Sequence, residues 1–357
     1  MAAVIQGADT TTETCVGRKR RLLVVAGPGR SGTSLYTGLV ARLGYHVPKP
    51  EVASNSSNPR GFSEPRWAVD FHNQLLDRAR VHVDDGRPEA WDRTARIGAA
   101  ERPRLRLRGW LEEQFAEHDH VVVKDPRLAW FLDLYRAVAA DLGVEVSVAT
   151  LIRHPTEVLR SREIAYGRKT PNSARAMAWI NMMLGIESRT RDLPRAVVAY
   201  DDLLDGWREA IEVADRGLGL GLVSSATQAQ LASAGTLVDP SLRRSSASWE
   251  ELDLPPRIRD LLERVHTAYG TLVTGPVDEH PGCRDRLDEL SSEFAQFYTE
   301  SWQAVAHRVR ARLAAERRRG AEEAALAASP RPATTRAASI RAFAGRWRSR
   351  VSGRRRS

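Results

Sequence analysis

The 357-residue chain is poor in cysteine and lysine, with two cysteines and only four lysines beside 50 arginines. Two cysteines, Cys15 and Cys283, do not make a disulfide framework, and we expect a reducing, cytoplasmic setting. No apolar run approaches the roughly 20 residues that a bilayer-spanning helix needs. The stretch 1–17 is polar and Thr-rich, without the basic and apolar regions of a signal peptide. The nine histidines are scattered and no Cys/His spacing resembles a zinc ligand set, so we expect no metal site.

The net charge of +9 is concentrated in one part of the chain. From Arg308 to the C-terminus there are 15 Arg and 3 Glu, so the rest of the chain carries a net charge of −3. Because the body of the chain is near neutral, the composition argues against nucleic acid as a partner. The content of 42% hydrophobic and 28% charged residues is typical of a globular protein with a full apolar core.

A glycine-rich turn between an apolar strand and a helix is the most specific local signal. Residues 22–26 read Leu-Leu-Val-Val-Ala, as in a buried parallel strand, and Gly27-Pro-Gly-Arg-Ser-Gly-Thr-Ser34 follows. Such a turn directs backbone N–H groups and a helix N-terminus at a bound phosphate. Gly27 and Gly32 have the spacing of a Walker A loop, but Thr33 stands where the lysine of that loop belongs. The missing lysine argues against hydrolysis of a nucleoside triphosphate.

The periodicity predicts an open parallel α/β sheet of the P-loop type, flanked by helices, with a helical C-terminal extension. Strands are expected at 22–26, 120–124, 144–152 and 195–200, and their carboxyl ends carry the unusual residues, where ligands of such sheets bind. Residues 47–66 read as a long irregular loop, 67–80 and 103–117 read as helices, and 84–100 has no clear pattern. The predicted domains are a disordered lead (1–20), an α/β domain (21–255), a helical extension packed on it (256–320) and a basic tail (321–357).

Six motifs, in order along residues 20–250, resemble those of the sulfotransferases that use 3′-phosphoadenosine 5′-phosphosulfate (PAPS). The phosphate loop resembles the bacterial branch, which carries Arg-Ser-Gly-Thr-Ser where cytosolic enzymes carry lysine. The other matching segments are Asn58-Pro-Arg-Gly-Phe-Ser-Glu64, Lys124-Asp-Pro-Arg127, Ile152-Arg-His-Pro155 with Ser161, Tyr200-Asp-Asp-Leu203 and Asp239-Pro-Ser-Leu-Arg-Arg244.

The resemblance implies a binding site for PAPS and for its product PAP. It assigns the 3′-phosphate to Arg153 and Ser161, and further nucleotide contacts to Tyr200 and to the late basic loop with Arg243 and Arg244. A guanidinium can grip a phosphate with two hydrogen bonds, and a hydroxyl adds a third. The phosphosulfate falls to residues of the loop, namely Gly29, Arg30, Ser31, Gly32, Thr33 and Ser34.

The same resemblance implies that Lys124, with Arg30, stabilises the transferring sulfonate. A lysine at a strand end is notable in a chain that otherwise uses arginine. The acceptor hydroxyl needs a base. Glu64 is the first candidate and Glu51 its rival, and the chain leaves open a histidine instead, namely His72, His118 or His120. Asp125 and Asp201 are expected to anchor loops, Arg127 to add a nucleotide contact, and Trp179 and Met183 to pack in the core or line an acceptor pocket.

These observations predict an enzyme, a PAPS-dependent sulfotransferase acting on a hydroxyl of a carbohydrate or glycolipid. The alternatives are a P-loop nucleotide kinase or NTPase, and a PAP-binding module without catalysis. In the segment 330–357, Ile340, Phe343, Trp347 and Val351 recur at helical spacing among arginines. This pattern suits either a disordered tail or an interfacial helix on anionic lipid. The second interpretation would place the protein peripherally on the inner membrane face.

Overall fold

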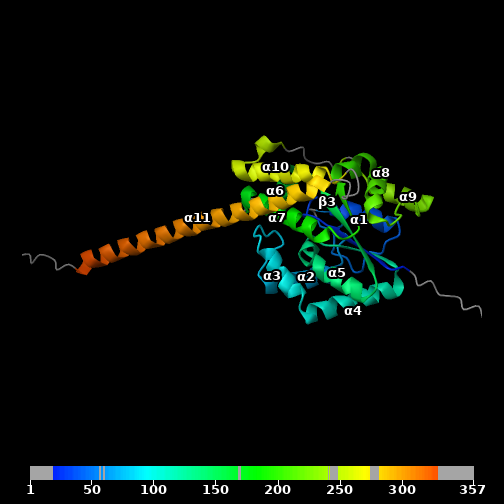
Figure 1. Ribbon diagram of the computed structural model, residues 1–357, viewed down its shortest axis with the longest axis horizontal. Coiled ribbons are helices and arrows are strands. Elements are labelled where there is room, and N and C mark those ends of the chain that lie inside the picture. The colour runs from blue at the N-terminus through cyan, green and yellow to red at the C-terminus, as the bar shows by residue number, and fades with distance from the viewer. Residues whose placement is uncertain are drawn as a thin grey trace, which may run out of the picture. The chain divides into compact units, whose positions relative to one another are not determined.

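Four parallel strands, in the order β2-β1-β3-β4, form the centre of the fold. The computed structural model describes residues 19–55, 58, 61–167, 170–239, 241, 248–273 and 281–328 (Figure 1). The strands are β1 (Arg21–Ala26), β2 (His120–Lys124), β3 (Glu145–Ile152) and β4 (Arg195–Ala199). Together with the flanking helices and a long C-terminal helix they confirm the predicted α/β fold class.

The helices follow the strands in the alternating order of a parallel α/β fold. Their bounds, in chain order, are α1 (Thr33–Arg42), α2 (Arg66–Ala79), α3 (Ala90–Gly98), α4 (Glu101–Glu117), η1 (Pro126–Phe131), α5 (Leu132–Asp141), α6 (Pro155–Tyr166), α7 (Asn172–Thr190), α8 (Tyr200–Leu218), α9 (Gln228–Gly235), η3 (Trp249–Glu251), α10 (Pro256–Gly270) and α11 (Pro281–Ala328).

The strand order creates a switch point between β1 and β3. From β1 the chain crosses to β2 on one side, and from β2 it returns past β1 to β3 on the other. Val25 pairs with Lys124 of β2 and Ala26 with Thr150 of β3, so the carboxyl ends of the strands lie in register at one edge. Ligands of open α/β sheets bind at such a switch point, beyond the carboxyl ends of the strands.

Alternate residues of β1 pack into two different cores because successive side chains of a strand point to opposite faces. Leu22 and Val24 join the core formed with α2, α3, α4 and α5. Leu23 and Val25 join the core formed with α1, α8 and α9. The apolar run recognised in the sequence is therefore buried on both faces, as a central parallel strand requires.

A third core, formed by α6, α7 and α10 with the start of α11, covers the β4 side of the fold. An ion network adds to it. Glu187 of α7, almost fully buried, accepts hydrogen bonds from Arg191 and from Arg195. Arg191 also pairs with Asp288 of α11 at 2.7 Å. This network fixes the first turns of α11 against α7.

The chain divides into two units, Met1–Tyr298 and Thr299–Ser357. In the second unit, α11 continues to Ala328 and exposes Trp302 and Val309. The predicted disordered lead, apart from residues 19 and 20, and the predicted interfacial helix at 330–357 lie outside the described residues. Within the described residues, no helix has the length and apolar character needed to cross a membrane.

Candidate active site

The phosphate loop, residues 27–32, leaves the carboxyl end of β1 in a conformation that needs glycine at two positions. Gly27 has a φ of 135°, and a Cβ there would lie 2.8 Å from the carbonyl oxygen of Leu151. Gly32 has a φ of 90°, and its Cβ would lie 2.3 Å from the ring of Tyr200. The two glycines therefore let the loop approach β3 and the start of α8.

The N-terminal N–H groups of α1, which follows this loop, are not capped by a side chain. Gly32 is the N-cap of α1, no side chain caps the helix, and its first turn contains no acidic residue. The hydroxyl of Ser31 is fully buried and has no hydrogen-bond partner among the described residues. Because an unmatched buried hydroxyl is costly, these donors fit an oxyanion better than an empty turn.

Arg30 connects the loop to α6. Its φ of 78° lies in the left-handed region, which residues with a side chain seldom adopt. Its Nε donates to the Ser161 hydroxyl at 3.0 Å. The structure thus joins the residue predicted for the phosphosulfate to one predicted for the 3′-phosphate.

Lys124, at the carboxyl end of β2, brings three separate segments together. Its Nζ donates to Glu64 Oε1 at 2.6 Å, to Ser34 Oγ at 3.1 Å and to the Phe62 carbonyl at 3.1 Å. The Lys124 side chain is 3% exposed and that of Glu64 9%. An ammonium has three protons, so these contacts use all of them. The sequence predicted a role for each of Ser34, Glu64 and Lys124, and the structure places the three in contact.

Asp125, the next residue, is held by a fully buried histidine. His72 Nδ1 lies 2.7 Å from Asp125 Oδ2, and His72 Nε2 lies 3.1 Å from the Tyr135 hydroxyl. An ionised carboxylate only accepts, so Nδ1–H donates to Asp125 and, in the neutral ring, Nε2 accepts from Tyr135. Burial alone would raise the pKa of Asp125, but the hydrogen bond from His72, with the nearby Arg127, lowers it to about 2. Asp125 anchors the turn after Lys124, as predicted from the sequence.

Arg127 follows in the same turn and is tied to α2. Its Nη1 donates to Asp125 Oδ1 and its Nε to Asn73 Oδ1, both at 2.7 Å. Burial lowers the pKa of Arg127, but Asp125, Glu64 and Asp84 outweigh it and raise that pKa above its ordinary value. Arg127 therefore remains a cation near Glu64 and Asp125.

Arg153 and Tyr200, at the ends of β3 and β4, stack on each other. The guanidinium lies 4.5 Å from the centre of the Tyr200 ring, and Nε donates to Glu157 at 2.6 Å. The other side of the contact is the phosphate loop, since the Tyr200 ring packs on Gly32. Arg153, the residue predicted to bind the 3′-phosphate, is thus connected to the phosphate loop through the ring of Tyr200.

The other candidates for the base either lie away from Lys124 or have side chains that make other contacts. Glu51 forms an ion pair with Lys49. His120 begins β2 and stacks on Tyr45, and His118 stacks on His46, at the opposite end of the strand from Lys124. His72 is bonded to Asp125 and is fully buried, with 0% exposure. Of the other candidates, Trp179 and Met183 are buried in the third core. Arg243 and Arg244 lie outside the described residues.

Arg162 also lies in this region, although the sequence did not predict it as a site residue. It lies on α6, only 7% of its side chain is exposed, and Nη1 pairs with Asp84 at 2.7 Å. Its Nε donates to the Gly29 carbonyl at 3.2 Å, which fixes the loop backbone. The signal available in the sequence was its position directly after Ser161.

The described residues contain no group of three or more His, Cys, Asp or Glu side chains that could hold a metal ion. Arg162 contacts the backbone of the phosphate loop, and Lys124 contacts Ser34 directly after it.

Comparison with known proteins gives distant structural likenesses. No protein-family model and no curated protein matches the chain. Among solved structures, the fold is similar to the sulfotransferase domain of the olefin synthase from Synechococcus PCC 7002, at 16% identity and a TM-score of 0.43. That match covers 71% of this chain and 96% of the other.

Proposed function

We propose that this protein is a sulfotransferase that transfers a sulfonate group from PAPS to an acceptor hydroxyl. One observation carries the proposal: Ser34 in the first turn of α1, directly after the phosphate loop, meets Glu64 at the buried ammonium of Lys124. The three come from segments that are far apart in the sequence. A cation, a carboxylate and a phosphate loop in contact are the groups that an in-line transfer to a hydroxyl needs.

The residues of the loop fit an anionic donor. The unmatched Ser31 hydroxyl and the uncapped N-terminus of α1 supply hydrogen-bond donors for the phosphosulfate, with Arg30 beside them. Arg153 and Ser161 would hold the 3′-phosphate. Bound there, PAPS supplies the sulfonate and a leaving phosphate.

The roles of this chain's own residues follow from their chemistry. Glu64 accepts the proton of the acceptor hydroxyl. Lys124 donates a hydrogen bond to the oxygen on which charge develops as the sulfur–oxygen bond breaks. Since the three protons of Lys124 are engaged with protein oxygens, this role requires it to exchange one of those contacts.

The nature of the acceptor and the location are separate parts of the proposal. The family resemblance and the basic segment 330–357 support a hydroxyl of a carbohydrate or glycolipid as the acceptor. If the segment 330–357 binds anionic lipid, the enzyme would lie in the cytoplasm, at the inner membrane face. Flotation with anionic vesicles should depend on residues 330–357. Equal flotation of the full and truncated chains would contradict the membrane part alone.

Calorimetric titration with PAP and with ATP tests the donor site. We expect wild type to bind PAP more tightly than ATP, and Arg153→Ala and Arg153→Lys to lose most of the affinity for PAP. Arg160→Ala is the matched control, because Arg160 lies on the same helix but pairs with Glu251 in an exposed ion pair. Tighter binding of ATP than of PAP would instead favour a P-loop nucleotide kinase or NTPase.

A transfer assay separates the enzyme from a PAP-binding module. Sulfonate transfer from radiolabelled PAPS to a panel of carbohydrate and glycolipid hydroxyls is expected, and Lys124→Met should abolish it. Tight PAP binding without transfer across a broad panel would favour the non-catalytic module.

A further inference from the structure

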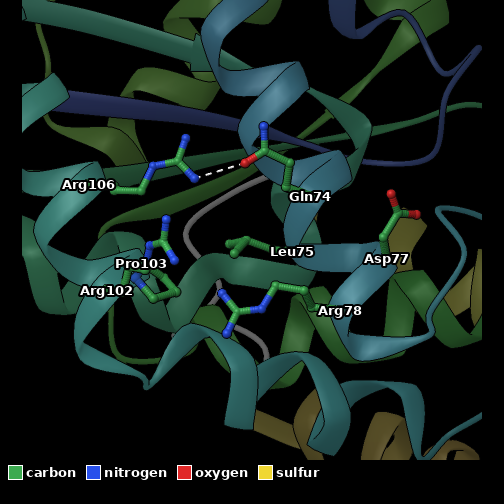
Figure 2. Close-up of a pocket in the computed structure, with 7 residues that line it drawn as sticks. All are labelled: Gln74, Leu75, Asp77, Arg78, Arg102, Pro103 and Arg106. Carbon is green, nitrogen blue, oxygen red and sulfur yellow. Dashed lines mark hydrogen bonds between the residues drawn. The ribbon is translucent and has the colours of Figure 1, made fainter.

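A surface pocket of about 540 Å³ between α2 and α4 is lined by three arginines. The two helices run antiparallel, with Trp67 stacked on Trp110 at 4.5 Å toward one end and Gln74 bonded to Arg106 further along. The lining residues are Gln74, Leu75, Asp77, Arg78, Arg102, Pro103 and Arg106 (Figure 2).

The guanidinium groups share one side of this pocket. Figure 2 shows Arg78, Arg102 and Arg106 directed into the space beside Leu75, while the carboxylate of Asp77 lies on the far side of Leu75. Arg106 is fixed, because Nη1 donates to Gln74 at 2.9 Å and the guanidinium lies 5.2 Å from the centre of the Phe71 ring. The side chains of Arg78 and Arg102 have no ion pair or hydrogen bond with any other described residue.

The neighbouring face of α4 shows that this arrangement is not a general property of the helix. Arginine occurs at 102, 104, 106 and 108, so residues 102 and 106 share one face and 104 and 108 share the next. On that second face each arginine has an acid: Arg104 bonds Asp141, and Arg108 bonds Glu112 at 3.0 Å. On the first face the spacing of four residues places two like charges together, and α2 adds a third.

Like charges gathered in a concave surface repel one another unless an anion neutralises them. A guanidinium binds sulfate, phosphate or carboxylate with two parallel hydrogen bonds. Buried Leu75 and Pro103 add an apolar wall beside the charges. The chemistry of the pocket therefore suits an oxyanion attached to a carbon framework as well as a free oxyanion.

Contacts link this pocket to the proposed reaction centre. Arg127 donates to Asn73, and the next residue, Gln74, accepts from Arg106. Successive residues of α2 thus hold one arginine of the turn after Lys124 and one arginine of the pocket.

We propose that Arg78, Arg102 and Arg106 form a second oxyanion-binding site, for a sulfate, phosphate or carboxylate group, distinct from the phosphate loop. Its existence does not depend on the proposed function. The further idea that this oxyanion is a group of the acceptor molecule does rest on the proposed function.

The test compares two double variants with the same loss of charge. Arg102→Gln/Arg106→Gln removes two guanidinium groups of the pocket, and Arg104→Gln/Arg108→Gln removes the two paired ones from the next face. Two probes are used at constant ionic strength: inorganic sulfate and a sulfated tetrasaccharide. Binding is measured by calorimetry in the presence of PAP, which occupies the phosphate loop.

We expect Arg102→Gln/Arg106→Gln to weaken binding of at least one probe by tenfold or more, and Arg104→Gln/Arg108→Gln to change it less than twofold. Loss with both probes identifies a site for free oxyanions, and loss with the tetrasaccharide alone identifies a site for an anionic acceptor. Equal effects of the two double variants, or no binding of either probe, would overturn the proposal. If PAP itself does not bind, the proposed function fails, but the comparison of the double variants on sulfate still decides the site.

Discussion

Lys124 and Glu64 form a buried ion pair 2.6 Å long between the end of β2 and the loop before α2. Glu64 lies directly after Ser63, which has a positive φ of 51°. The main chain beside it is fixed too, since the Glu64 carbonyl accepts from Val52 N at 2.8 Å. The described residues next to Glu64 thus hold its carboxylate against the ammonium of Lys124.

Replacing Glu64 with glutamine should remove the base while keeping the hydrogen bond to Lys124, because an amide oxygen still accepts. We expect the turnover number for sulfonate transfer to fall by roughly 10²–10⁴-fold, with little change in PAP affinity. Steady-state kinetics and PAP titration check this. Glu51→Gln is the control and should keep near wild-type turnover. If Glu51→Gln loses activity and Glu64→Gln does not, Glu51 is the base.

The ion pair also makes a prediction about stability. Lys124→Met leaves the Glu64 carboxylate buried without its cation, and removal of one partner of such a pair costs roughly 3–5 kcal/mol. Lys124→Met/Glu64→Gln removes both charges and should be less destabilised than Lys124→Met alone. Urea unfolding of wild type, the two single variants and the double variant gives the coupling energy. Purely additive changes would show that the two side chains do not interact in solution.

The strands and the edge that carries the site could be predicted from the sequence because their signals are local. The apolar runs before Gly27 and before Lys124 define β1 and β2, and parallel strands place their carboxyl ends together. Pro155 was expected in the first turn of its helix, and α6 begins there. The roles proposed for Lys124 and Arg153 came from the resemblance of the motifs that follow β2 and β3 to those of a known family.

What could not be predicted depends on contacts between distant segments. Residues 84–100 gave no pattern because α3 is only nine residues long and buries just Ala90, Trp91, Thr94 and Gly98. His72 lies on a helix face with Phe71 and Leu75, where nothing local shows that Asp125 will meet it. Arg162 looked like an ordinary helix residue, since its contact with Gly29 exists only after α6 has packed on the loop.

Two glycines should respond in opposite ways to replacement by alanine. At Gly32 a Cβ would lie 2.3 Å from the Tyr200 ring on a backbone with a φ of 90°. Gly32→Ala should therefore lose more than about 1–3 kcal/mol of stability and most of its PAP affinity. Gly109 lies inside α4, and a Cβ added there would have nothing within 4 Å. Gly109→Ala should gain roughly 0.5–1 kcal/mol from helix propensity. Urea unfolding and PAP titration measure both, and a neutral Gly32→Ala would contradict the packing of Tyr200 on the loop.

Stability should fall as the pH is lowered from about 6.5 to 4, because of His266. Burial, with a smaller contribution from the charge of His154, lowers the pKa of His266 from 6.5 to about 4. Between these values the unfolded chain binds a proton that the folded protein does not, so acid favours unfolding. A shift of this size corresponds to a loss of roughly 3 kcal/mol, complete near pH 4. Asp125, whose pKa is lowered from 3.8 to about 2, adds a further loss only below that range.

The measurement is the free energy of unfolding in urea at several pH values from 4 to 7. In His266→Phe the ring remains but the titrating group is gone, so the loss between pH 6.5 and 4 should shrink by most of the histidine's contribution. His307→Gln, at an exposed position of α11, should follow wild type. Parallel curves for wild type and His266→Phe would show that His266 is not held neutral in the folded protein. The acid sensitivity would then have to come from another group that gains protons on unfolding.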